Sequence, residues 1–203
     1  MMKKLIVRKL YRLVLLVVPV LYYYWYKKYY ALAIVCAFAF SLTLDIIRLT
    51  NPTANDKVRQ FFGPFAKFMR FIAKREELTD FSGTTYALMG CAIIMITMPK
   101  TVGITAILFN IIGDLFATII GIRFGKTKIL GEKTLEGSFA CFISLIAVVA
   151  WSNWKLGLPW VVGIIGAIIA TITELVPIKI HNFKINDNLT IPIISGVVMW
   201  LLL

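Results

Sequence analysis

The stretch Gly113–Ser138, GDLFATIIGIRFGKTKILGEKTLEGS, combines an acidic side chain in an apolar run with a loop rich in lysine and glycine. Asp114 stands near its start, inside an apolar run long enough to cross a membrane. An acid at the centre of a membrane helix costs roughly 3 kcal/mol on insertion scales, so its presence there predicts a function. The loop that follows can wrap phosphate, because glycine lets backbone N–H groups approach and lysine supplies positive charge. Together, the acid and the loop suggest metal-bound phosphate at a membrane face.

The composition around this stretch is typical of a polytopic membrane protein. Of the 203 residues, 60% are hydrophobic and 16% are charged, whereas a soluble domain is about half apolar and a quarter charged. The apolar residues fall in runs of about 20, the length that crosses a bilayer. We expect an all-α fold forming a single membrane-embedded domain, 1–203. Its seven predicted transmembrane helices cover about 10–26, 29–47, 81–98, 101–122, 137–154, 159–178 and 189–203.

The distribution of positive charge predicts the orientation of these spans. Eighteen of the 22 lysines and arginines fall in the amino-terminal tail and the loops on its side of the membrane. The positive-inside rule then places the amino terminus and the long loops in the cytoplasm and the carboxyl terminus outside. The membrane would be the plasma membrane in a prokaryote and the endoplasmic reticulum in a eukaryote. The tryptophans lie at the predicted outer ends, as an interfacial belt would: Trp25, Trp151, Trp154, Trp160 and Trp200.

The net charge of +12 would suit nucleic acid, but its concentration in the cytoplasmic loops indicates the bilayer as the partner instead. The segment 57–75 has apolar residues at three- and four-residue spacing with basic residues between them. This pattern predicts an interfacial helix attracted by anionic lipid. The alternative is that this helix covers the bundle and has no role in lipid binding. Nothing in the sequence supports an oligomer.

The polar residues of the fourth span share one predicted helix face. Asn110, Asp114, Ala117 and Gly121 follow one another at offsets of four, three and four residues. The face could be a packing surface with one satisfied polar pair. However, a carboxylate this far inside the span needs a cation or a proton, and Mg²⁺ carrying nucleotide phosphates meets that need.

The loop carries three lysines that could each bind phosphate: Lys126, Lys128 and Lys133. Any of them, Lys128 in particular, could instead be a topology signal. The segment Lys133–Ser138 combines a cation, a hydroxyl, a carboxylate and a glycine at the start of a helix, where N–H groups point at an anion. The chain has no GxxxxGK[ST] P-loop and no kinase-type glycine loop.

Other polar residues lie near the predicted cytoplasmic ends of the spans. Glu174 lies about one turn inside the sixth span, whereas His181 is expected to be a surface residue. Asp45 and Arg48, three residues apart, predict an ion pair that is either structural or on the substrate side. Thr84 opens the third span and is expected to cap it, or to contribute to the same side.

This combination of segments resembles the CTP-dependent lipid kinases, namely dolichol and polyprenol kinase, phytol kinase and the CTP-dependent diacylglycerol kinase. Besides Gly113–Ser138, the segment ATITELVPIKIHNFKINDNLTIPII (170–194) is similar to a second element of that family. LDIIRL (44–49) and SGTTYALMG (82–90) are similar to further elements, so the resemblance covers most of the chain from about Ser41 onward. Phosphatidate cytidylyltransferase is related and also has a Lys-Thr-x-Glu-Gly element. The Asp-Asn-Leu ending and the lack of a diglycine after Gly137 favour the kinases.

The resemblance implies transfer of the terminal phosphoryl group of CTP to the hydroxyl of a membrane lipid, either diacylglycerol or a polyprenol, with Mg²⁺. It implies that Asp114 binds the metal, that Glu136 orients the loop or the metal, and that Glu174 is a general base or second ligand. The catalytic set is then Asp114, Glu174, Lys133 and Glu136. The implied nucleotide and phosphate ligands are Asn110, Lys126, Lys128, Lys133, Thr134, Gly137, Ser138, Asp187 and Asn188.

Two alternative functions remain at this stage. A phosphatidate cytidylyltransferase would make CDP-lipid and pyrophosphate from CTP. A non-enzymatic transporter would also place polar groups inside the membrane. A transporter often shows internal repeats, which are not evident here, and it gives no reason for the Lys133–Ser138 segment.

Overall fold

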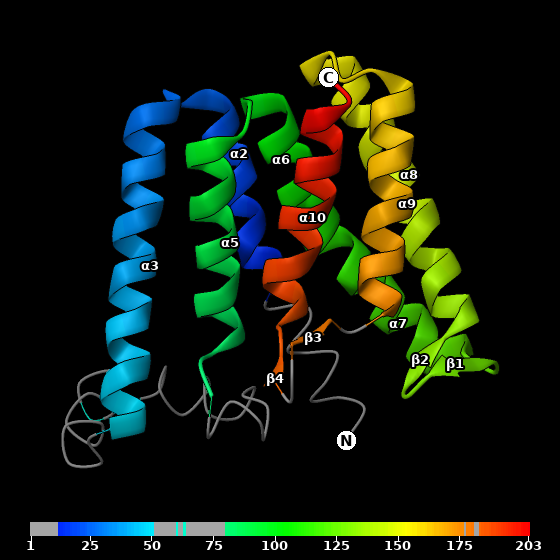
Figure 1. Ribbon diagram of the computed structural model, residues 1–203, viewed down its shortest axis with the longest axis horizontal. Coiled ribbons are helices and arrows are strands. Elements are labelled where there is room, and N and C mark those ends of the chain that lie inside the picture. Colours follow the sequence, from blue (N-terminus) through cyan, green and yellow to red (C-terminus); the bar gives the residue numbers. More distant parts are fainter. Residues whose placement is uncertain (1–11, 51–59, 61–62, 64–79, 177, 181–182) are drawn as a thin grey trace.

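The computed structural model describes residues 12–50, 60, 63, 80–176, 178–180 and 183–203. These residues form a bundle of roughly parallel and antiparallel helices with two short hairpins at one end (Figure 1). The predicted interfacial helix 57–75 lies outside the described residues apart from Gln60 and Gly63, and His181 lies outside them too. The elements are η1 (Arg12–Leu16), α2 (Val17–Tyr24), α3 (Lys27–Thr50), α5 (Gly83–Thr97), α6 (Lys100–Leu108), η3 (Phe109–Gly113), α7 (Asp114–Phe124), β1 (Lys128–Leu130), β2 (Lys133–Thr134), α8 (Leu135–Leu156), α9 (Trp160–Leu175), β3 (Lys179–Ile180), β4 (Phe183–Lys184) and α10 (Asp187–Leu201).

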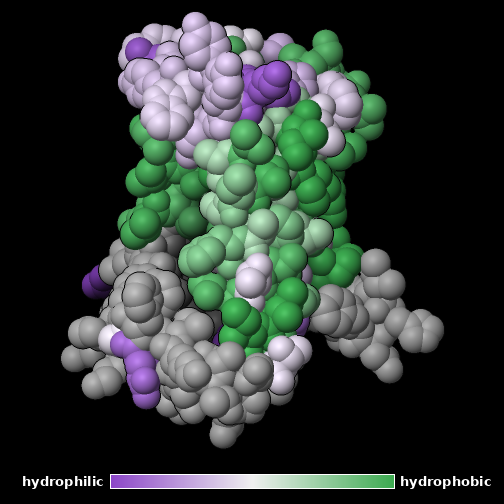
Figure 2. Space-filling view, turned by 90° about the vertical axis from the view of Figure 1, so that its left-hand side faces the viewer, coloured by the Kyte–Doolittle hydropathy of each residue, from purple (hydrophilic) through white to green (hydrophobic). Residues whose placement is uncertain are grey.

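Three helices are long and apolar enough to cross a membrane: α3, the continuous helix Lys100–Phe124, and α8. Four further apolar helices are shorter: Leu13–Tyr24, Gly83–Thr97, Trp160–Leu175 and Asp187–Leu201. The helical membrane-protein class therefore agrees with the sequence, while the number of seven spans stays a prediction. Figure 2 shows a hydrophobic band around the middle of the bundle and a less hydrophobic end above it.

Local signals in the sequence explain where the helices begin and end. The Ser82 side chain caps α5 by accepting a hydrogen bond from the Thr85 N–H, so the predicted capping role belongs to Ser82 and not to Thr84. Asn186 caps α10 in the same way through the Asn188 N–H. Gly157 ends α8 in the left-handed conformation, with φ of 69°. Only three residues separate the end of α8 at Leu156 from the start of α9 at Trp160, so these two packed helices run antiparallel.

The helix Lys100–Phe124 contains the most deeply buried segment of the fold. Val102 to Ile111 is buried at every position, and Phe109 is fully enclosed. Helix α7 packs on α8, α10 packs between α5 and α9, and α3 lies at one side against α5 (Figure 1). The end of α9 and the start of α10 therefore meet the middle of the central helix.

A π-helical turn, η3, interrupts this central helix just before Asp114. The shared face predicted for Asn110, Asp114, Ala117 and Gly121 assumed regular α-helical spacing. That assumption is wrong at this turn, because a π turn holds an extra residue and shifts the register across it. Such turns are frequent at functional sites.

Candidate metal and phosphate site

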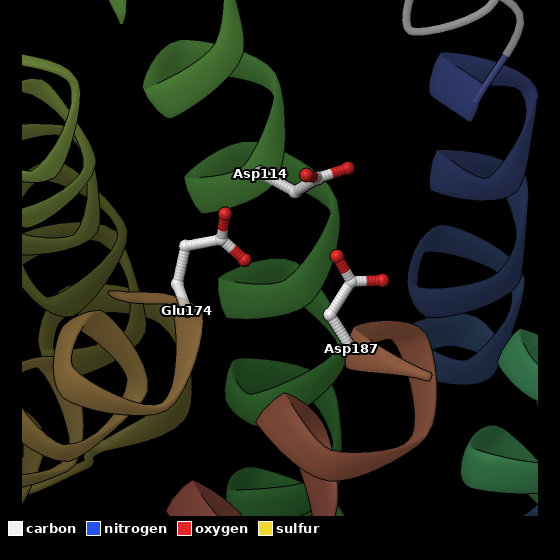
Figure 3. Close-up of side chains that lie close together, drawn as sticks. All are labelled: Asp114, Glu174 and Asp187. Atoms are coloured by element: carbon white, nitrogen blue, oxygen red, sulfur yellow. The ribbon is translucent and has the colours of Figure 1, made fainter. Parts of the chain in front are cut away.

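Three acidic side chains from different helices converge in the interior of the bundle. Asp114, Glu174 and Asp187 each bring one carboxylate oxygen within 4.8 Å of the others (Figure 3). Asp114 and Glu174 are buried, at 4% and 7% exposure, and Asp187 is half-buried. Like charges this close repel one another in a region of low dielectric. The cluster therefore needs cations or protons to offset its negative charge.

Each acid is placed by a feature of its own element. Asp114 is the first residue of α7, directly after the π turn. Glu174 lies one residue before the end of α9. Asp187 is the first residue of α10, where the helix N-terminus favours a negative charge. The hairpin β3–β4 joins α9 to α10, so the last two acids lie on neighbouring helix ends.

One lysine reaches this cluster from the hairpin β1–β2. The ammonium nitrogen of Lys133, Nζ, lies 2.9 Å from Oε1 of Glu174 and donates a hydrogen bond to it. The other oxygen, Oε2 of Glu174, is buried and has no hydrogen-bond partner among the described residues. An unsatisfied buried oxygen is costly unless a further ligand satisfies it.

These donors fit a divalent cation. Mg²⁺ prefers carboxylate oxygens, and one or two carboxylates together with substrate phosphates are its usual protein site. Here three carboxylates converge, and the buried Oε2 of Glu174 lacks any other partner in the described part of the chain. Sequence reasoning placed Asp114 in a metal set with Glu136, and gave Glu174 a metal role only as an alternative. The approach of Asp187 depends on tertiary packing, although an acid opening an apolar span was a visible signal.

The segment Lys133–Ser138 builds the turn that carries Lys133. The Thr134 hydroxyl caps α8 by accepting from the Gly137 N–H at 3.2 Å. The Ser138 hydroxyl donates to the Thr134 carbonyl at 3.2 Å. Glu136 accepts from the Thr127 N–H at 3.1 Å and 3.3 Å, one bond to each oxygen. These contacts hold the loop in shape, so three of the predicted phosphate ligands have structural partners here.

Several predicted site residues do not join the acid cluster. Glu136 lies on the loop side of α8, so its predicted metal role finds no support from the position of Asp114, Glu174 and Asp187. Lys126 and Lys128 are exposed, and Lys128 lies 3.8 Å from Glu132. Their roles in phosphate binding stay predictions, as does the role of Glu174 as a general base.

The two asparagines predicted to bind nucleotide connect helices. The Asn110 side chain donates through Nδ2 to the Asn188 carbonyl at 3.4 Å. Asn188 donates through its own Nδ2 to the Gly83 carbonyl at 3.1 Å. The side-chain oxygen of Asn110, Oδ1, is buried without a hydrogen-bond partner among the described residues. The pair therefore ties the central helix to α10 and α5 behind the acids.

The Asp45–Arg48 pair belongs to a separate polar network between α3 and α5. Asp45 accepts from the Ser82 N–H at 2.7 Å and from the Thr85 hydroxyl at 2.6 Å. Arg48 lies 2.9 Å from the other Asp45 oxygen and donates to the Asp80 carbonyl at 2.6 Å. These bonds join two helices, which favours the structural reading of the pair.

A large apolar groove runs along α8. Its volume is about 1320 Å³, and it opens between α2, the central helix and α8. Ile112, Phe116 and Ile120 form one wall, and Phe139 and Ala147 belong to the other. Glu136 lies at one end and Lys155 at the other. Sequence reasoning missed the groove, because its walls come from segments far apart in the chain.

Comparison with known proteins places the chain among relatives of unassigned activity. It is 30% identical over 190 residues to the uncharacterized protein RP860 of Rickettsia prowazekii, which covers 92% of this chain and 88% of that protein. It is 34% identical over 148 residues to the uncharacterized protein MJ1137 of Methanocaldococcus jannaschii, covering 70% and 69% respectively. The chain belongs to the family of RP860 and MJ1137.

This family has a more distant relative of named activity. The chain is 23% identical over 181 residues to the CTP-dependent diacylglycerol kinase 1 of Schizosaccharomyces pombe. The match covers 82% of this chain and 78% of that kinase. No family model matches the chain, and no solved structure matches it.

Proposed function

We propose that this member of the RP860 and MJ1137 family is a lipid kinase, which transfers the terminal phosphoryl group of CTP to the hydroxyl of a membrane lipid. The products are CDP and a lipid phosphate. The observation that carries the proposal is the convergence of Asp114, Glu174 and Asp187 beside Lys133. The distant similarity to a kinase named as CTP-dependent and acting on diacylglycerol supports the same reaction class.

The acids and the lysine have complementary roles in this proposal. Phosphoryl transfer depends mostly on positioning and on neutralising phosphate charge. Asp114, Glu174 and Asp187 would hold Mg²⁺, which would supply charge neutralisation at the phosphates. Lys133 extends from an exposed hairpin toward the acids, so its ammonium group can contact a phosphate that approaches from the same side.

The groove along α8 supports a lipid as the acceptor. Its volume of about 1320 Å³ exceeds the roughly 300–1,000 Å³ of typical small-molecule pockets. Its walls are almost entirely aliphatic and aromatic, and in a membrane they would face hydrocarbon. Glu136 at one end of the groove lies three residues from Lys133 in the chain. A hydrocarbon chain in the groove would therefore lead toward the loop that carries Lys133.

The proposed orientation places the reaction in the cytoplasm, where CTP is available. Figure 1 shows the hairpins β1–β2 and β3–β4 at the same end of the bundle. This is the end that the distribution of lysine and arginine assigns to the cytoplasm.

The decisive test is transfer of label from γ-labelled CTP by purified protein in detergent with Mg²⁺. Diacylglycerol, a polyprenol and phosphatidic acid are offered in parallel. We expect label on one of the two neutral lipids, and a loss of about 100-fold in the Asp114→Asn variant, the scale seen when one charge-stabilising group is removed. The matched control is Glu132→Gln, because the Glu132 side chain is 97% exposed in the hairpin turn.

Other outcomes would overturn the proposal in identifiable ways. Pyrophosphate released only with phosphatidic acid would show a cytidylyltransferase. Equal activity in the Asp114→Asn and wild-type proteins would remove the acid cluster from the mechanism. Folded protein that consumes no CTP with any lipid would exclude the enzyme and leave transport as the leading function.

A further inference from the structure

Lys133 and a divalent cation would both bind the carboxylate of Glu174. The lysine Nζ lies 2.9 Å from Oε1 of Glu174. The exposed fractions of the two side chains differ, at 30% for Lys133 and 10% for Glu174. The lysine therefore reaches from a partly exposed hairpin to an acid that is almost fully enclosed. In the part of the chain that the structure describes, Glu174 forms no ion pair with any other residue.

We propose that Lys133 is the resident counter-cation of the acid cluster and makes binding of the metal and of the nucleotide mutually dependent. Without nucleotide, the ammonium group offsets the charge of Glu174 and repels an incoming divalent ion. With nucleotide, the same group binds a phosphate, and its repulsion of the metal is offset by the phosphate charge. The metal half of this inference rests on the acid cluster, and the nucleotide half rests on the proposed function.

The position of Lys133 allows this exchange. An ammonium group has three donors, and the bond to Glu174 uses one of them. The hairpin turn that carries Lys133 is anchored separately, by the Thr134 cap and by Glu136 on the Thr127 N–H. The backbone can therefore stay in place while the lysine side chain changes partner. The second carboxylate oxygen of Glu174, Oε2, already lacks a partner among the described residues and remains available to an ion.

Two effects of Lys133 on metal affinity have opposite signs. Its positive charge weakens metal binding by repulsion, whereas its hydrogen bond orients Glu174 and strengthens metal binding. Repulsion acts over a longer range than a single hydrogen bond, and at this buried site it is screened less than on a surface. We therefore expect the charge to dominate. Coupling between ligands is reciprocal, so if bound nucleotide raises the affinity for the metal, bound metal raises the affinity for the nucleotide by the same factor.

The test measures Mn²⁺ binding to the purified full chain by electron paramagnetic resonance, without nucleotide. We expect Lys133→Gln and Lys133→Met to bind Mn²⁺ about tenfold more tightly than the wild type, the low end of the range for close charge pairs. Lys133→Arg keeps the charge and should bind Mn²⁺ as the wild type does. Lys28→Met removes the same charge from the exposed opposite end of the bundle and serves as the control.

Two further measurements and a fallback variant complete the test. In the presence of Mn²⁺, CTP should bind Lys133→Gln about tenfold more weakly than the wild type, and Lys133→Arg should restore most of the affinity. In a Glu174→Gln background, Lys133→Met should tighten Mn²⁺ binding less than it does in the wild-type background, because the Glu174 carboxylate that holds the ammonium group beside the site is gone. If Lys133→Met fails to fold because Glu174 loses its partner, Lys133→Gln carries the comparison through its side-chain amide donor.

The inference is overturned if Lys133→Gln binds Mn²⁺ with unchanged or lower affinity. It is also overturned if metal affinity rises while CTP affinity stays the same, because Lys133 would then be a counter-ion without coupling. A third outcome separates the two proposals. If Lys133→Gln binds Mn²⁺ more tightly but the wild-type protein transfers no phosphoryl group to any lipid, the proposed function is refuted and the counter-cation role of Lys133 remains.

Discussion

At the scale of single residues, the acids and glycines of Gly113–Ser138 have separate tasks. Asp114 contributes charge to the cluster, and Gly137 permits close packing of α7 and α8. A Cβ on Gly137 would lie 2.7 Å from the Ala117 carbonyl oxygen and 3.2 Å from the Gly121 Cα. Both neighbours are backbone atoms, which cannot move aside as a flexible side chain can.

Gly137→Ala should therefore destabilise the protein by about 2 kcal/mol, because α7 and α8 have to separate to admit the methyl group. Thermal unfolding in detergent measures the effect. The matched control at the next position is Ser138→Ala, which removes the bond to the Thr134 carbonyl and should cost about 0.5 kcal/mol. Equal losses from the two substitutions would show that the close approach of the helices is not what requires glycine.

At the scale of elements, the network around Asp45 holds α3 against the rest of the bundle. Helix α3 packs mainly on α5, and its bonds to Ser82 and Thr85 lie at the start of that helix. Asp45 is 6% exposed, so its charge depends on these donors and on Arg48.

Asp45→Asn should lower the free energy of unfolding by about 2 kcal/mol, the scale of a hydrogen bond to a charged group. Thr43→Ala on the same helix is the control, because the Thr43 hydroxyl is exposed and bonds only to the Ala39 carbonyl of its own helix in the structure. Thermal unfolding and lipid kinetics are measured together. A selective rise in the KM for lipid with unchanged stability would assign Asp45 to the substrate side.

At the scale of the whole molecule, the groove and the acid cluster lie on different sides of the central helix. The groove is bounded by α2 and α8. Asp114 meets Glu174 from α9 and Asp187 from α10. A lipid whose tail lay in the groove would have to reach the acids around the end of α7 that leads into the hairpin β1–β2.

Ala147→Phe should therefore raise the KM for the lipid several-fold without changing the KM for CTP, because the ring would fill part of the groove. Ala147 is exposed on the groove wall. The matched control is Ala33→Phe, an equally exposed alanine on α3 outside the groove. Steady-state kinetics with mixed micelles measures the KM values of both variants for the lipid and for CTP. Equal effects of both variants on lipid KM would show that the groove does not hold the acceptor.

The orientation of the chain in the membrane is a second property of the whole molecule. Eighteen of 22 basic residues on one predicted side should keep the hairpin at Gly131 in the cytoplasm and the turn at Gly157 outside. In bacterial cells, alkaline phosphatase joined after Gly157 should be active, and the same enzyme joined after Gly131 should be inactive. The reverse pattern would invert the topology and place the acid cluster away from cytosolic CTP.

The amino-acid sequence by itself was enough to predict the helical membrane class and the approximate helix limits, and it singled out Asp114, Lys133 and Glu174 as candidate site residues. Apolar run length, caps and the cost of a buried charge are local properties, so they can be read without knowing the fold. The predicted span 137–154, for example, falls inside α8, Leu135–Leu156.

Only the tertiary structure decided which polar groups meet. Asp187 reaches Asp114 and Glu174 because α9 and α10 pack against the central helix, whereas Glu136 turns to the Thr127 N–H. The π turn before Asp114 and the groove along α8 also had no local signal. Distances between residues far apart in the chain depend on packing of whole helices, and the spacing of residues along one segment does not contain that information.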